Sequence, residues 1–306
     1  MSSAPVPVEV VGLTCRYDDV TAVDGVSFDV QHGELYALLG TNGAGKTTTL
    51  ETLEGHRAPD GGTVRVLGGD PADRRRTRPR VGMMLQESGL AADLTVAESL
   101  DLVGRLSGRR DDVPPLLDRV GLADKANVRV VQLSGGERRR LDLAMAVYGS
   151  PPLLFLDEPT TALDPAARDR LWELVADLRR EGTTVLLTTH YLEEAEQHAD
   201  RIGVLHRGRL VREGSLAELV GTMPSVLEFE ASAAPPRWPA HREGRRFSVG
   251  TRQPQADLLE LLRWAEREQV ELENLRCTPP SLAEIFRQVD GTSARDDLRP
   301  ATAVAS

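Results

Sequence analysis

A glycine-rich stretch, GTNGAGKTT at residues 40–48, carries the most recognisable chemistry in the chain. It fits the pattern G-x-x-x-x-G-K-[ST], and it stands between an apolar run and a helical one, as a phosphate-binding loop must. Gly43 and Gly45 let successive backbone N–H groups converge on phosphate oxygens, and the dipole of the following helix adds to that field. The motif predicts that Lys46 reaches the β and γ phosphates and that the Thr47 hydroxyl ligates Mg²⁺.

Two carboxylates and two further polar residues follow other apolar runs. Asp157 and Glu158 come directly after LLFL, and His190 follows VLLTT. Because ligands bind at the carboxyl ends of strands in open α/β sheets, these side chains are expected at one edge. Asp157 is expected to take part in magnesium coordination, and Glu158 is expected to act as a general base on a water molecule. His190 is expected near the γ-phosphate and Gln86, after VGMML, near magnesium or water, although both also fit ordinary structural roles.

Tyr17 and the stretch LSGGE at 133–137 are ambiguous by themselves. An exposed Tyr17 ring can stack on adenine, and it can equally be a surface tyrosine. In LSGGE, Ser134 and Glu137 have the spacing of a capping box, so the stretch predicts a helix start. A second glycine-rich helix start far from the phosphate loop requires an explanation that the local pattern does not supply.

The elements that must position these residues alternate between strands and helices, which predicts an α/β fold with a parallel sheet. Apolar residues at i, i+3, i+4 and i+7 predict the helices, and short apolar runs predict the strands. The expected elements are strands within 6–39, a helix at 46–54, a helical segment at 88–150, strands at 153–156 and 184–189, and between these two a helix starting at Asp164–Pro165.

Composition predicts a second, smaller domain. Proline and small residues gather at about 222–240, after which come two predicted strands and two helices. The expected division is a main domain at 1–222, a small α+β domain at 223–290 and a disordered tail at 291–306.

Bulk composition narrows the function classes. The net charge of −10 and the pI of about 5.2 disfavour a general nucleic-acid binder. Two cysteines without CxxC spacing indicate neither a disulfide framework nor a zinc site. No apolar run approaches the roughly 18 residues of a membrane helix, so the sequence predicts that this chain does not span a membrane.

Taken together and in order, these motifs resemble the ATP-binding cassette of ABC transporters over about residues 1–220. The resemblance implies a P-loop NTPase fold: a RecA-like core, an antiparallel β-subdomain and a helical subdomain at about 88–150. It implies ATP and Mg²⁺ as cofactors and ATP hydrolysis as the activity. It also implies a homodimer in which LSGGE binds the γ-phosphate of the nucleotide held by the other subunit.

The resemblance assigns roles by position. Tyr17 looks like the adenine-stacking residue, Glu158 the catalytic base and His190 the switch histidine, while Asp164 looks like the D-loop aspartate. The residues implied to bind ATP are Tyr17, Gly40, Thr41, Asn42, Gly43, Ala44, Gly45, Lys46, Thr47 and Thr48. The implied catalytic residues are Glu158, His190 and Gln86, the implied magnesium ligands are Thr47, Gln86 and Asp157, and the implied signature residues are Leu133, Ser134, Gly135, Gly136 and Glu137.

LTVAESL, GGERRRLDLA and TPPSLAEIFRQVDG look like the bacterial multidrug and antibiotic-export branch, the daunorubicin-resistance type. That branch implies a separately encoded polytopic membrane permease, a place on the cytoplasmic face of the membrane, and efflux of drugs, antibiotics or lipid-like substrates. Thr41, where proline is common, and Ala162, where glycine is common, depart from the pattern. A cassette ATPase acting on ribosomes or DNA without transport is the alternative.

Overall fold

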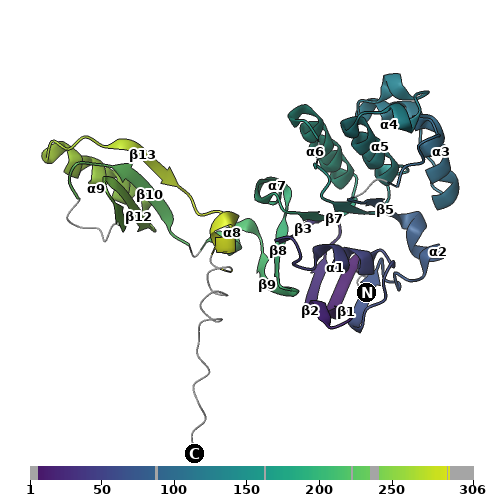
Figure 1. Cartoon of the computed structure of the whole chain (residues 1–306), viewed down its shortest axis with the longest axis horizontal. Helices are drawn as coiled ribbons and strands as arrows, with labels where there is room; N and C mark the ends of the chain where they lie inside the picture. Colours follow the sequence, from purple (N-terminus) through teal and green to yellow (C-terminus); the bar gives the residue numbers. More distant parts are fainter. Residues whose placement is uncertain are drawn as a thin grey trace, which may run out of the picture. The chain divides into compact units, whose positions relative to one another are not determined.

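The structure is a computed structural model that describes residues 6–86, 89–161, 163–221, 223–234, 241–287 and 289. The described residues form two compact units, one ending at Ser215 and one beginning at Leu216 (Figure 1). The division falls before the expected change at about 222, because helix α8 (Leu216–Val220) belongs to the second unit. Ala162 and the predicted tail at 291–306 lie outside the described residues.

A six-stranded sheet forms the centre of the first unit and confirms the predicted parallel α/β core. The first five strands in its order are parallel and the last is antiparallel to its neighbour. In spatial order they are β5 (Val81–Met84), β6 (Leu153–Asp157), β7 (Thr184–Thr189), β3 (Leu35–Gly40), β8 (Arg201–His206) and β9 (Arg209–Gly214). Every residue of β3, β6 and β7 is buried, as continuous apolar runs require when helices cover both faces of a sheet.

Helices connect the strands of this sheet. They are α1 (Lys46–Leu53), α2 (Arg74–Thr77), α3 (Val96–Ser107), α4 (Val113–Arg119), α5 (Gly135–Val147), α6 (Pro165–Arg180) and α7 (Leu192–His198). Three of them, α3, α4 and α5, lie between β5 and β6, within the segment predicted to be helical. In α6, Asp164 caps the first turn and the buried face carries Leu171, Leu174, Val175 and Leu178, as the sequence periodicity predicts.

A three-stranded antiparallel sheet completes the first unit, with the order β2 (Val20–Val30), β1 (Val8–Tyr17), β4 (Gly61–Val66). Its buried side chains share one hydrophobic core with the central sheet: Leu13 and Phe28 join Leu38, Leu50 and Phe155 in the same cluster. This shared core fixes the antiparallel sheet against the phosphate loop and α1.

The second unit has its own sheet and core. The strand order is β11 (His241–Glu243), β12 (Arg246–Thr251), β10 (Ser225–Glu230), β13 (Glu273–Thr278), all antiparallel. Helix α9 (Pro254–Arg267) packs Leu261 and Trp264 against Phe229 and Phe247. The α+β character of this segment agrees with the sequence, whereas β11 and β12 were not predicted.

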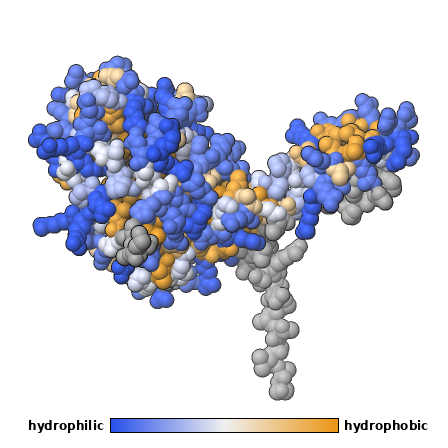
Figure 2. Space-filling model, turned by 180° about the vertical axis from the view of Figure 1, so that it is seen from behind, coloured by the Kyte–Doolittle hydropathy of each residue, from blue (hydrophilic) through white to orange (hydrophobic). Residues whose placement is uncertain are grey.

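Among the described residues, none of the helices has both the length and the apolar composition needed to cross a membrane. The surface drawn in Figure 2 is mostly hydrophilic, with smaller apolar patches between the hydrophilic areas.

Candidate functional site

A cleft of about 430 Å³ opens at the carboxyl end of the central sheet. It is lined by residues 42–48 of the glycine-rich loop together with Ala22, Gln86, Glu158 and His190. The loop follows β3, Gln86 follows β5, Glu158 follows β6 and His190 follows β7. Because these strands are parallel, their ends meet at one edge, and side chains far apart in sequence converge there.

Two glycines allow the phosphate loop its shape. Gly45 has a φ of +103°, and a Cβ there would lie 2.5 Å from the carbonyl oxygen of Ala22. At Gly40 a Cβ would lie 2.6 Å from the carbonyl oxygen of Leu205. Neither position has room for a side chain, so the loop packs directly onto neighbouring backbone. Ala22 was not predicted as a site residue, since contact through a main-chain carbonyl leaves no mark on residue type.

Lys46 is 6% exposed and begins helix α1. Its Nζ donates to the carbonyl oxygens of Gly40, at 2.6 Å, and Thr41, at 3.2 Å. Burial lowers the pKa of Lys46, against which the negative charges of Glu158 and Asp157 act. The ammonium group therefore lies within the field of both carboxylates, at the base of the loop.

Asp157 is the last residue of β6, and its carboxylate accepts a hydrogen bond from the Thr188 hydroxyl on the paired strand β7. Burial raises the pKa of Asp157, since an ionised carboxylate loses hydration there. Thr47 and Gln86 on the cleft and Asp157 beside it offer hydroxyl, amide and carboxylate oxygens. Hard oxygen donors of this kind fit Mg²⁺.

Glu158 holds an uncommon backbone conformation, with φ of +47°. Its N–H donates to the carbonyl oxygen of Thr188 at 2.9 Å, and the residue is 9% exposed. Its Oε1 lies 3.0 Å from Nδ1 of His190, whose side chain is 40% exposed. A non-glycine residue in the left-handed region is strained, and such residues concentrate at functional sites. The arrangement holds one carboxylate at the cleft wall with an imidazole beside it.

Tyr17 does not line the cleft. Its hydroxyl donates to Glu51 at 3.2 Å, and the Arg57 guanidinium lies 4.0 Å from the ring centroid. The ring is 43% exposed. One face of Tyr17 thus stacks against a cation, and adenine stacking stays a prediction.

LSGGE also lies outside the cleft lining. Its capping box is present: the Glu137 N–H donates to Ser134 Oγ at 3.2 Å, and the Ser134 N–H donates to Glu137 Oε2 at 2.8 Å. Lys125 forms an ion pair with Glu137 at 3.2 Å. These hydrogen bonds hold the pKa of Glu137 at about 2, with Lys125 adding to the effect. Within one chain, the stretch is a well-formed helix start that contributes nothing to the phosphate site.

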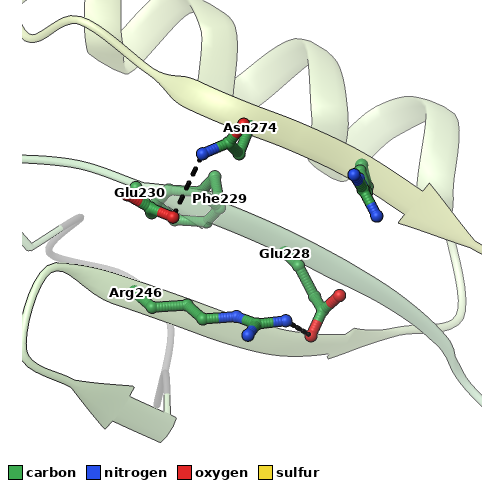
Figure 3. A pocket seen from close by; sticks show the side chains of 6 residues that line it. Glu228, Phe229, Glu230, Arg246 and Asn274 are labelled. Atoms are coloured by element: carbon green, nitrogen blue, oxygen red, sulfur yellow. Dashed lines mark hydrogen bonds and ion pairs between the residues drawn. The ribbon is translucent and has the colours of Figure 1, made fainter.

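A second hollow, of about 280 Å³, lies on the sheet of the second unit (Figure 3). Four of its polar side chains form two pairs, Arg246 with Glu228 at 3.0 Å and Asn274 with Glu230 at 3.1 Å, and Arg276 also lines it. Two of the lining residues, Glu228 and Glu230, are carboxylates, whose negative charge disfavours a phosphate here.

The sequence matches known families in both units. A family described as ABC transporter matches residues 23–161, and one described as ABC transporter domain-containing protein-like, C-terminal domain, matches residues 222–281. The chain is 48% identical over 213 residues to the Nod factor export ATP-binding protein I of Paraburkholderia xenovorans, covering 67% of this chain and 70% of that protein. It is 43% identical over 242 residues to the daunorubicin/doxorubicin resistance ATP-binding protein of Streptomyces peucetius, covering 77% and 73%.

Solved structures of ABC transporter cassettes are also similar to this chain. An ATP-binding subunit of an ABC transporter superposes with a TM-score of 0.67 at 31% identity, over 70% of this chain and 92% of that one. A bacterial ABC transporter cassette solved as a dimer superposes with a TM-score of 0.61 at 26% identity, over 68% and 98%. The likeness covers the fold that holds the cleft.

Proposed function

The chain belongs to the ABC transporter family as an ATP-hydrolysing subunit with the P-loop NTPase fold, and we propose that it works as a head-to-tail dimer driving a separate membrane permease. The observation that carries the proposal is the convergence of Lys46, Gln86, Glu158 and His190 on one cleft from four separate segments. We propose the same residue assignments that the sequence predicts, and the domain division at 1–222 and 223–290.

In this proposal the phosphate loop binds ATP. Backbone N–H groups of the loop and the N-terminus of α1 face the phosphates, and Lys46 leaves its carbonyl partners Gly40 and Thr41 to neutralise the β and γ phosphates. The buried position of Lys46 strengthens this attraction, because little water competes for the ammonium group.

Hydrolysis in this proposal uses Glu158 and His190, which line the same cleft as the phosphate loop. Glu158 accepts a proton from water as the water oxygen bonds to the γ-phosphorus, and the bond from that phosphorus to the bridging oxygen breaks, leaving ADP and phosphate. His190, 3.0 Å from Glu158, keeps the carboxylate oriented and faces the γ-phosphate. Mg²⁺, when bound, would neutralise charge on the phosphate oxygens. Thr47, Gln86 and Asp157 would hold the ion, so ATP and Mg²⁺ are the proposed cofactors.

LSGGE is proposed to complete the site of a second copy. Its helix start carries Ser134 and two glycines, and the N-terminus of a helix suits a phosphate. No residue of the stretch lines the cleft of its own chain. Two chains arranged head to tail would place each LSGGE on the ATP of the other. The solved dimer of a bacterial ABC transporter cassette supports dimerisation.

Export is the proposed direction of transport. The matched relatives are named for Nod factor export and for daunorubicin/doxorubicin resistance, so drug, antibiotic or lipid-like substrates are proposed here. The membrane-crossing part is proposed to be a separately encoded permease, with this chain on the cytoplasmic face. These relatives favour export over the ribosomal or DNA-directed alternative.

The proposal is tested by measuring ATP binding and Mg²⁺-dependent phosphate release by the purified chain, beside the variant Lys46→Ala. We expect both activities in the wild type and loss of both in the variant. A wild-type chain that neither binds nor hydrolyses ATP would contradict the proposal.

A further inference from the structure

Arg139 lies in the middle of the arginine run that follows LSGGE, on the first turns of α5. It is 6% exposed, although arginine is almost never fully buried unless it is paired. Its partners are main-chain carbonyl oxygens from two distant segments. Nε donates to Pro159 at 3.2 Å, Nη1 donates to Leu85 at 2.6 Å and Gln86 at 3.3 Å, and Nη2 donates to Asp157 at 2.9 Å and Glu158 at 2.6 Å.

The hydrogen bonds of Arg139 use the whole guanidinium group. Arginine has five N–H donors in a planar fork, and here they meet five carbonyl oxygens. Hydrogen bonds to a charged group are stronger than neutral ones, and burial removes the water that would compete for them. The side chain therefore fixes the two segments against α5 as a rigid connection.

The two segments carry the residues of the proposed reaction. Gln86 of the first segment and Glu158 of the second line the cleft, and Asp157 is the last residue of β6, directly before Glu158. Arg139 touches the backbone of these residues and not their reacting atoms. At the other end, only one residue, Arg138, separates Arg139 from Glu137 in LSGGE.

From these contacts we infer that Arg139 is a positioning residue that couples the signature helix to the catalytic loops. When LSGGE engages the ATP of a partner subunit, α5 carries Arg139 with it, and Arg139 sets Gln86 and Glu158 for attack on the ATP of its own chain. The inference rests on the proposed function and adds to it a physical link between the two sites of the dimer.

The neighbouring Arg140 provides a matched control. It lies on the same helix and carries the same charge, but its buried Nε has no hydrogen-bond partner among the described residues. Arg140→Met therefore makes the same change of side chain at the next residue, and it leaves the hydrogen bonds of Arg139 to Leu85–Gln86 and Asp157–Pro159 in place.

The experiment measures the Kd for ATP, and kcat and KM for phosphate release, in full-length Arg139→Met, Arg139→Lys and Arg140→Met, each per mole of ATP-binding protein. We expect kcat to fall about 10²-fold in Arg139→Met, with the Kd for ATP nearly unchanged, because misplaced catalytic groups cost rate rather than binding. Lysine has one nitrogen and cannot reach both segments, so Arg139→Lys should lose most of that rate as well. Arg140→Met should keep the wild-type kcat.

A double-mutant cycle separates coupling from simple support. Ser134→Ala should lower kcat less in the Arg139→Met background than in the wild type, because the connection that transmits the state of LSGGE is already broken. Additive effects would overturn the inference. A lower melting temperature with wild-type kcat per ATP-binding molecule would do so too, since it would mean that Arg139 only stabilises the fold.

The outcomes distinguish this inference from the proposed function. If the wild-type chain hydrolyses ATP and Arg139→Lys keeps the wild-type kcat, the coupling role is wrong while the proposed function stands. If the wild-type chain shows no ATP-dependent activity, both are wrong. Should Arg139→Met fail to fold, Arg139→Lys alone decides, since lysine keeps the charge and nearly the same length.

Discussion

The Nδ1 atom of His190 lies 3.0 Å from Oε1 of Glu158. Glu158 directly follows strand β6 and His190 directly follows strand β7, and these two parallel strands are paired. Strand pairing at Asp157 and Thr188 sets this distance, because Glu158 and His190 lie just beyond the pair. The sheet thus places a carboxylate and an imidazole in contact at the wall of the cleft. Several outcomes can be predicted from this arrangement and its surroundings.

Replacing Glu158 by glutamine removes the proton acceptor and keeps the shape of the side chain. We expect kcat to fall by about 10²–10⁴, with ATP affinity retained, because the phosphate loop is unchanged. Phosphate release and equilibrium ATP binding measure the two effects. Wild-type turnover in Glu158→Gln would show that another group accepts the proton.

Replacing His190 by alanine removes the group that orients Glu158. We expect kcat to fall while the Kd for ATP changes little, and the loss to be non-additive with that of Glu158→Gln, since the two side chains act together. The double variant is the control: a decrease equal to the product of the single effects would mean that His190 acts independently of Glu158.

Buried Glu54 predicts a dependence of stability on pH. Burial, with the nearby charges of Asp157 and Glu51, raises its pKa to about 8 from the usual 4.5, and Oε2 lies 3.2 Å from His56 Nδ1. Between these values the folded state holds a proton that the unfolded state releases. The contribution of Glu54 to stability is therefore fully present below about pH 4.5 and falls as pH rises toward 8, by at most about 1.4 kcal/mol per pH unit.

The variant Glu54→Gln tests this dependence, because glutamine has the same shape and does not ionise. Urea denaturation between pH 5 and pH 9 should show a flatter pH profile in the variant and greater stability than the wild type at pH 9. Identical slopes in the two proteins would mean that Glu54 ionises normally in the folded state.

The capping box at LSGGE predicts an effect on folding that is separate from catalysis. Ser134→Ala should lower the free energy of unfolding by about 1 kcal/mol, since the Glu137 N–H loses its acceptor. The pKa of Glu137, held at about 2, means that its ionised form stabilises the folded state above about pH 4.5 and that this contribution is lost as pH falls toward 2. Glu137→Gln should lose this acid-range dependence in a denaturation series, and retention of it would assign the effect to other carboxylates.

The strands that carry the site could be predicted because they are buried on both faces. Their sequences, LYALLG, LLFLD and TVLLTT, are largely apolar. The first ends at Gly40 of the phosphate loop, the second ends at Asp157, and His190 directly follows the third. The hairpin of β8 and β9 was missed: its turn places Arg207 at φ +48° and Gly208 at φ +78°, and arginine is not a usual residue for that conformation. Strand β12 was also missed, although Phe247, Val249 and Thr251 alternate on its buried face, because it is short and follows a proline-rich segment.

The sequence identified residues with reactive side chains that line the cleft, and it missed contacts made through the backbone. Lys46, Glu158 and His190 have residue types that chemistry demands at fixed places in the order of the chain. Ala22 lines the cleft through its position, and Arg139 binds carbonyl oxygens that every residue possesses. Its only sequence signal is an arginine run on a helix start, which equally describes a solvated face.

Mixing two inactive chains tests whether LSGGE acts on the ATP of a second subunit. One carries Lys46→Ala and the other Gly135→Asp, both in a Glu158→Gln background that prevents hydrolysis. A Cβ built at Gly135 meets nothing within 4 Å, and an acidic residue at a helix start is favourable, so Gly135→Asp should leave its own chain folded.

The measurement is ATP-dependent dimerisation by analytical ultracentrifugation, for each chain alone and for the mixture. Neither chain alone should dimerise, because its homodimer would lack either both phosphate loops or both signature stretches. The mixture should dimerise, because one of its two sites joins an intact phosphate loop to an intact LSGGE from the other chain. A mixture that stays monomeric while Glu158→Gln alone dimerises with ATP would show that LSGGE does not act on the ATP of a second subunit.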